Sequence, residues 1–162
     1  MCNPYNTNHY PYEVYSPYNL NHSSNNVYSN QRRDPIVQLR NSAYGEFYLG
    51  IDADTGAVVL SRHPGGGVHW KMDEVTAILV TLQSRTRSLY LNYFLGINEN
   101  PSTVTLSACI SNNVYWKMKR KGNIVTLQNL SNNLFLGING NTDAIELSNH
   151  QNEGTKWIIT AH

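Results

Sequence analysis

The sequence predicts an all-β domain built from three similar four-stranded units and preceded by an irregular arm. Three observations carry this prediction. One motif recurs three times, apolar and polar residues alternate inside each copy, and turn-forming residues separate the alternating segments. The 162 residues leave room for one hydrophobic core, because single domains commonly span roughly 100 to 200 residues.

Residues 1–34 form the predicted arm, and their composition differs from that of the rest of the chain. They hold six of the eleven tyrosines and three of the six prolines, with almost no aliphatic residues. Pro4, Pro11 and Pro17 interrupt any regular ladder, so we expect an extended or disordered arm without a core of its own. Tyrosine buries a large area with few torsions to freeze. The arm could therefore instead become ordered against a neighbouring subunit of a homo-oligomer.

The recurring motif is an aromatic residue followed by Leu-Gly-Ile and then by Asp or Asn. It occupies residues 48–52, 94–98 and 135–139. A Leu-Ser pair begins ten residues after each glycine, and a tryptophan follows twenty residues after it, without a gap in any copy. The tryptophans are Trp70, Trp116 and Trp157. Equal spacing in all copies indicates repetition of one structural unit.

These spacings divide residues 35–162 into repeats at about 35–76, 77–121 and 122–162. Within each repeat the apolar residues are separated by one residue, which is the period of a strand with one buried face. In the first repeat these pairs are Val37 and Leu39, Leu49 and Ile51, Val58 and Leu60, and Trp70 and Met72. Four short strands per repeat give twelve in all. Each tryptophan is in phase with the buried residues of its strand, so we expect the indole rings in the core rather than stacked on a sugar.

Three such units could form a small propeller or a closed barrel with a hairpin cap. Propellers typically have four or more blades, and three sheets would leave exposed edges, so the barrel is favoured. On the Leu-Gly-Ile segments and the tryptophan of each copy, residues 35–160 resemble the β-trefoil superfamily and its ricin B-type lectin branch. The resemblance implies six barrel strands, three capping hairpins and lectin-like sugar binding. Val68, Val114 and Thr155 stand where that branch usually carries the glutamine of Gln-x-Trp, so the resemblance is to the fold more than to the sugar site.

Two further resemblances concern the setting. The Leu-Gly-Ile segments are similar to those of the fascin and hisactophilin branch, which implies an actin- or membrane-binding alternative. Residues 1–10 resemble the Asn-Pro-Tyr and Asn-Glu-Tyr starts of bacterial insecticidal crystal proteins, which implies a spore, parasporal or toxin-associated setting. The chain shows no signal peptide, and residues 77–80 form its longest apolar stretch. We therefore expect no membrane span and a cytoplasmic protein, deposited in a spore or parasporal inclusion and released by lysis.

The charge and the cysteine content limit which partners and which disulfides can be expected. Twelve Lys and Arg oppose eleven Asp and Glu, so no overall field favours nucleic acid. The one dense basic run, residues 117–121, is interpreted as a solvated turn that ends at Gly122. Cys2 and Cys109 are too few for a disulfide framework. They could form one disulfide that ties the arm to the body, or remain free thiols in a reducing cytosol.

Polar loops supply the binding candidates. Each Leu-Gly-Ile segment is followed by an Asx-x-Asx pair, whose side chains could bond the vicinal hydroxyls of a glycan, with avidity from three sites. Alternatively these side chains accept hydrogen bonds from their own turns. Residues next to two of the tryptophans point away from the core and could stack on a ligand. The ligand-binding candidates are Asp52, Asp54, Asn98, Asn100, Asn139, Asn141, His69 and Tyr115.

No motif indicates an enzyme. The chain lacks a nucleophile elbow, a phosphate loop and a cysteine or histidine pair at catalytic spacing, and its six histidines lack metal-ligand spacing. We expect no catalytic residue, metal or cofactor. The sequence thus predicts a non-enzymatic, carbohydrate-directed binding module. The alternative is a self-assembling protein that forms fibres or crystals when its arm docks on the next subunit.

Overall fold

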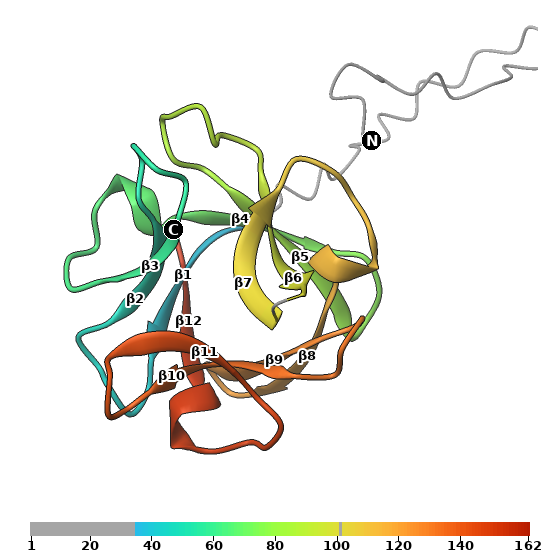
Figure 1. Cartoon of the computed structure of the whole chain (residues 1–162). Helices are drawn as coiled ribbons and strands as arrows, with labels where there is room; N and C mark the ends of the chain where they lie inside the picture. The colour runs from blue at the N-terminus through green and yellow to red at the C-terminus, as the bar shows by residue number, and fades with distance from the viewer. Residues whose placement is uncertain (1–34, 101) are drawn as a thin grey trace, which may run out of the picture. The chain divides into compact units, whose positions relative to one another are not determined.

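The computed structural model describes residues 35–100 and 102–162 (Figure 1). The predicted arm, including Cys2, lies outside these residues. The strands are β1 (Ile36–Asn41), β2 (Tyr48–Ile51), β3 (Val58–Ser61), β4 (Trp70–Glu74), β5 (Leu79–Ser84), β6 (Phe94–Glu99), β7 (Ser102–Ser107), β8 (Trp116–Lys121), β9 (Ile124–Asn129), β10 (Phe135–Asn139), β11 (Ala144–Ser148) and β12 (Trp157–Ala161). A single-turn 3-10 helix precedes the last strand of each repeat: η1 (Gly66–Val68), η2 (Asn112–Val114) and η3 (Glu153–Thr155).

Six strands close into a barrel. Around the ring, β1 pairs with β4, β4 with β5, β5 with β8, β8 with β9, β9 with β12, and β12 with β1, always antiparallel. The remaining strands form the hairpins β2–β3, β6–β7 and β10–β11. The second strands of these hairpins, β3, β7 and β11, contact one another, and Figure 1 shows the three hairpins arranged around one centre. This is the barrel with a hairpin cap that the repeat predicts.

The three tryptophans lie in the core, as their strand phase predicts. Each indole ring is 0% exposed, and each Nε1 donates a 3.0 Å hydrogen bond to a backbone carbonyl in the hairpin of its own repeat. The donor and acceptor pairs are Trp70 and Leu49, Trp116 and Leu95, and Trp157 and Leu136. Trp side chains bury the largest area of any residue, and the bonds satisfy their only polar group.

The glycine of the Leu-Gly-Ile motif is required by a close approach. The 3-10 turn of each repeat passes directly over it, so that a Cβ on Gly50 would lie 3.0 Å from a methyl group of Val68. The same approach recurs over Gly96 and Gly137. Val68, at the position of the ricin-type glutamine, is the last residue of this turn, and its side chain is buried and offers nothing to a ligand. The departure from Gln-x-Trp is therefore a packing feature of this chain.

The basic run at residues 117–121 is in strand β8, so its interpretation as a turn was wrong. The run pairs with β9 along its whole length, and the turn begins only at Gly122, where φ is +64°. The side chains of Trp116 and Met118 pack into the core and hold β8 in place, and the strand continues to Lys121. Apolar residues at alternate positions thus decide the local structure, while the charges between them face solvent.

Candidate functional site

Two of the three Asx loops bond to their own backbone. The Oδ1 atom of Asp52 accepts hydrogen bonds from the backbone N–H groups of Asp54 and Thr55, both at 2.9 Å. These two bonds, with a further one from the Thr55 hydroxyl, hold the pKa of the Asp52 carboxyl below its ordinary value. Asn139 Oδ1 accepts from the N–H of Asn141 at 2.9 Å. One oxygen of each first Asx residue is thus used to shape the turn.

The second repeat does not share this geometry. The β6–β7 ladder continues past Asn98 to the pair of Glu99 and Ser102. The β10–β11 ladder ends one pair earlier, at Asn139, and the β2–β3 ladder ends before Asp52. Asn100 follows in the exposed turn. The three Asx pairs are consequently not three copies of one site, because the sequence pattern repeats while the local backbone does not.

The two aromatic candidates lie at equivalent positions but differ in their surroundings. His69 is half-buried: its Nε2 accepts a 3.1 Å hydrogen bond from the Gln38 side-chain nitrogen, and its ring packs edge-on against that of His162, with centroids 5.0 Å apart. Tyr115 is half-buried too, and its backbone carbonyl accepts from the N–H of Leu130 at 2.9 Å. Both residues are thus half-buried, and only the His69 ring has a described ring contact.

The Asx loops border pockets between successive repeats. Each pocket is bounded by the hairpin turn and 3-10 turn of one repeat and by the loop after the first strand of the next. The third-repeat pocket, of about 390 Å³, has Asn139, Asn141, Asn152 and Glu153 on one side and Tyr44, from the first repeat, on the other. The two sides of this pocket come from the third and the first repeat, which are neighbours because β12 pairs with β1.

A buried asparagine fixes the far wall of this third-repeat pocket. Asn41, which is 0% exposed, donates from Nδ2 to the carbonyl of Gly154 at 2.7 Å. Its Oδ1 accepts from the N–H groups of Ala43 and Tyr44, both at 3.0 Å. Tyr44 then reaches over the turn, and its hydroxyl occupies the place where a side chain at Gly140 would lie. An aromatic ring, amides and a carboxylate thus converge at the third-repeat pocket, a combination that suits polyhydroxylated ligands.

The first-repeat pocket has the same position and a different chemistry. It has a volume of about 690 Å³, and it is lined by Ala53 and Gly67 of the first repeat and by Arg85 and Arg87 of the second. His69 lines it as well. Where the third repeat offers amides and a tyrosine, this pocket offers guanidinium groups, which favour anionic rather than neutral partners.

In the second repeat, a side-chain hydrogen bond crosses the place that corresponds to these two pockets. Ser131, from the loop after β9, donates from its hydroxyl to the Glu99 carboxylate at 2.6 Å. Asn129 repeats the buried role of Asn41, because its Nδ2 donates to the carbonyl of Asn113 at 2.8 Å. The scaffold is therefore shared, while the residues on its rim give each repeat its own surface.

Tyr44, Arg85 and Arg87 are the site residues that sequence reasoning missed. They lie in the loop after the first strand of a repeat, where insertions and deletions blur the alignment between copies. They also act on the preceding repeat, so no pattern within a single copy points to them. The signal that was available is Asn41 and Asn129, equivalent asparagines at the end of a predicted strand.

Comparison with known proteins rests on structure. No protein-family model matches the sequence, and no curated protein is similar enough in sequence to count as a relative. A designed threefold-symmetric protein, ThreeFoil, superposes with a TM-score of 0.66 at 13% identity, over 77% of this chain and 97% of that one. The fold is a β-trefoil. Two further solved structures also superpose on this chain.

The first of these is SeviL bound to asialo-GM1 saccharide, with a TM-score of 0.64 and 17% identity over 78% of this chain and 96% of that one. The second is a mosquitocidal holotoxin, with a TM-score of 0.67 and 19% identity. The trefoil covers 78% of this chain and 17% of the holotoxin chain. At these identities the likeness establishes the architecture.

Three further predictions concern the cysteines, a metal site and a membrane span. Cys2 lies outside the described residues, so the disulfide with Cys109, which is in the bend after β7, stays a prediction. No group of three His, Cys, Asp or Glu side chains that could hold a metal occurs in residues 35–100 and 102–162. In that same part of the chain, no helix has the length and apolar character needed to cross a bilayer.

Proposed function

We propose that the protein is a non-enzymatic, lectin-like carbohydrate-binding module whose principal sugar site is the third-repeat pocket. The observation that carries the proposal is the convergence of Tyr44 with Asn139, Asn141 and Asn152 from the neighbouring repeat. Sugar hydroxyls are donors and acceptors at once, and side-chain amides complement both roles. The tyrosine ring offers an apolar surface for the carbon face of a pyranose.

The hydrogen-bond capacity of the site supports this assignment. Asn139 uses Oδ1 on its turn and Asn152 uses Oδ1 on the N–H of Thr155, while within the described residues both side-chain nitrogens remain without a partner. The Asn141 side chain is exposed and bonds to no other described residue. The loops are thus held in shape by their own bonds and still present free donors outward, which lowers the entropy lost on binding.

The structural neighbours favour the same class of ligand and a wider setting. One was solved with a bound saccharide, and another is part of a mosquitocidal toxin. We extend the proposal accordingly: the module serves a spore, parasporal or toxin-associated protein, and residues 1–10, with their likeness to crystal-protein starts, belong to that role.

The proposal is tested by binding to a glycan array, followed by titration of the best glycan. We expect Asn141→Ala to abolish detectable binding by a folded protein. The matched control is Asn100→Ala, which removes the corresponding exposed Asx side chain from the second repeat and should leave binding unchanged. Equal losses in both variants would contradict a single principal site, and silence of the folded wild-type chain across all glycans would reject the function.

Deleting residues 1–34 separates this function from the self-assembling alternative. A carbohydrate-binding module should bind the same glycan with the same affinity per chain after the deletion. A protein whose role is assembly should lose its fibres or oligomers, which light scattering detects on the intact and shortened chains.

A further inference from the structure

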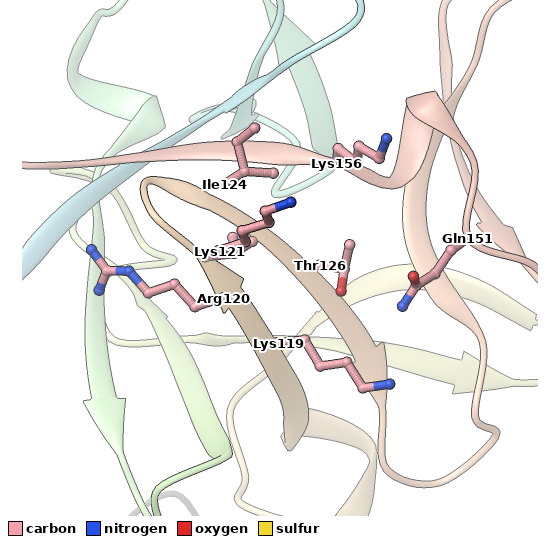
Figure 2. A pocket seen from close by; sticks show the side chains of 8 residues that line it. Lys119, Arg120, Lys121, Ile124, Thr126, Gln151 and Lys156 are labelled. Atoms are coloured by element: carbon pink, nitrogen blue, oxygen red, sulfur yellow. The ribbon is translucent and has the colours of Figure 1, made fainter.

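A further pocket, separate from the sugar site, lies where the β8–β9 hairpin meets the start of β12 (Figure 2). It has a volume of about 440 Å³, and we call it the lysine pocket. Its lining residues are Lys119, Arg120, Lys121, Ile124, Val125, Thr126, Gln151 and Lys156. This volume falls within the usual range of small-molecule sites, roughly 300 to 1,000 Å³.

The strand register brings these side chains together. Lys119 and Lys121 are two residues apart on β8 and therefore share one face, opposite to that of Trp116. Lys119 pairs across the hairpin with Thr126, and Lys121 pairs with Ile124. The third ammonium group comes from Lys156, next to the residue of β12 that pairs with β9.

The side chains converge on one space. In Figure 2, Lys121 extends toward Lys156, and Lys119 reaches the side where Gln151 lies. Arg120 points to the other side of the hairpin, where its Nε donates to the carbonyl of Gly122 at 2.8 Å. The dense basic run of the sequence is thus split between two faces. Arg120 lines the pocket as well, but its guanidinium is directed away from the space that the lysine side chains share.

The charge in the pocket is only partly compensated. Lys156 forms an ion pair with Glu153, and no other carboxylate of residues 35–100 and 102–162 forms an ion pair with the three lysines. Lys119 and Lys121 are exposed and make neither an ion pair nor a side-chain hydrogen bond with any residue in 35–100 or 102–162. Neighbouring like charges repel each other, so this cluster costs free energy unless an anion joins it.

The fold itself does not call for lysines here. In the first repeat the residue equivalent to Lys119 is Asp73, which pairs with Thr81 in the same register as Lys119 with Thr126. The residue equivalent to Lys156 in the first repeat is His69. One scaffold position therefore holds an acid in one repeat and a base in another, and packing cannot explain the choice.

We propose that the lysine pocket binds a sulfate or phosphate ester. Lysine ammonium groups act as compact point charges that bind oxyanions, and charge-assisted hydrogen bonds to such groups are the strong ones. The Thr126 hydroxyl and the Gln151 amide add neutral donors, and Ile124 offers an apolar surface to the carbon skeleton that carries the ester. The oxyanion could be free or attached to a sugar, since the chemistry in contact with the lysines is the same.

This inference does not depend on the sugar site, although the two sites are adjacent. Gln151 lines the lysine pocket, and Asn152 and Glu153 line the third-repeat pocket. A glycan that carries a sulfate or phosphate group could contact both. The sugar site can fail its own test while the lysine pocket still binds an inorganic anion.

The experiment is a titration of the full chain, followed by backbone amide NMR, with inorganic sulfate, inorganic phosphate, galactose 6-sulfate and galactose. We expect saturable shifts at residues 119–126 and 151–156 with the anionic probes, and none at these residues with galactose. Binding should weaken as NaCl is raised, because salt screens exposed charges. If the ester must be attached to a sugar, galactose 6-sulfate binds more tightly than the inorganic ions, and if it need not be, the affinities are similar.

Variants decide whether the pocket or the overall charge is responsible. Lys119→Gln and Lys121→Gln should each weaken binding of galactose 6-sulfate, which carries one negative charge, about fivefold, the effect of removing one unit charge about 4 Å away in a medium like water. Lys117→Gln removes the same charge from the same strand, but Lys117 does not line the pocket and its Nζ is held at Asn133 Oδ1, 3.1 Å away, so affinity should stay within about twofold. An equal loss in Lys117→Gln, or the absence of saturable shifts with every anion, overturns the proposal.

Discussion

The indole nitrogen of Trp70 donates a 3.0 Å hydrogen bond to the backbone carbonyl of Leu49, and the two residues are 21 positions apart. The other two repeats have the same bond at the same distance and the same separation. The bond ties the last strand of each repeat to the first strand of its hairpin. It therefore gives the motif and the tryptophan of each repeat a shared structural role.

Replacing one of these tryptophans tests that relationship. Trp116→Phe keeps an aromatic ring in the core but leaves the buried carbonyl of Leu95 without its donor. We expect a loss of about 1–3 kcal/mol in the free energy of unfolding, with a further loss from the cavity left by the smaller ring. Urea unfolding measures the change. Tyr115→Phe, at the adjacent half-buried position, should change stability little, and an equal effect of both substitutions would contradict the role of the bond.

Adjacent glycines in η1 offer a second, internally controlled prediction. A Cβ on Gly67 would lie 2.6 Å from the backbone carbonyl oxygen of Ile51, whereas a Cβ on Gly66 would have nothing within 4 Å. Gly67→Ala should therefore destabilise the protein by about 1–3 kcal/mol, as other overpacked sites do. Gly66→Ala should be neutral or slightly stabilising. Thermal unfolding of the two variants gives the comparison, and similar melting temperatures would show that the turn can move aside.

Asp52 gives a pH-dependent prediction. Its pKa is lowered in the folded protein, so its contribution to stability is complete well above the ordinary value of 3.8 and is lost as the pH falls through the folded pKa. Asp52→Asn retains an acceptor, as Asn139 does in the third repeat, but cannot titrate. The wild-type chain should be the more stable at neutral pH, and the difference should shrink as the pH falls below about 3.8.

Urea unfolding of both proteins at a series of pH values measures this difference. Asp54→Asn is the control, because its side chain accepts neither of the two turn bonds. A wild-type advantage that is independent of pH would mean that the charge of Asp52 does not strengthen the turn.

Asn41 links stability to the sugar site. Asn41→Ala would leave the Gly154 carbonyl and two backbone N–H groups without their partner, and should cost about 1–3 kcal/mol. Asn41→Ser should cost less, because Ser84 occupies the equivalent position and its Oγ accepts from the N–H of Thr86. Chemical unfolding ranks the variants, and a serine variant less stable than the alanine variant would contradict the equivalence.

Most of the fold could be predicted because its determinants are local and repeated. The alternation around Trp70 and Met72 places a strand, and its recurrence in three copies selects a closed barrel. The same logic failed for the run at residues 117–121, where charge was given more weight than the alternation of Trp116 and Met118. In a strand, the residues between the apolar ones are free to carry any charge.

The sites could be predicted only in part, because they join residues that are distant in sequence. The Asx loops were found, but the walls that face them, such as Tyr44 opposite Asn141, belong to the next repeat. Lys121 and Lys156 are brought together only by the pairing of β9 with both of its neighbours. Contacts of this kind depend on the ring order of the strands, which a pattern within one repeat does not contain.

The pairing of β1 with β12 has a consequence for how this chain could be re-engineered. The His162 amide bonds to the carbonyl of Ile36 at 2.8 Å, so residues 36 and 162 are neighbours. A short peptide joining them should allow new chain ends elsewhere, for example at the exposed Gly122–Asn123 turn, in a circularly permuted protein that keeps the same core. Loss of a whole repeat, in contrast, would leave two open edges that no permutation can repair.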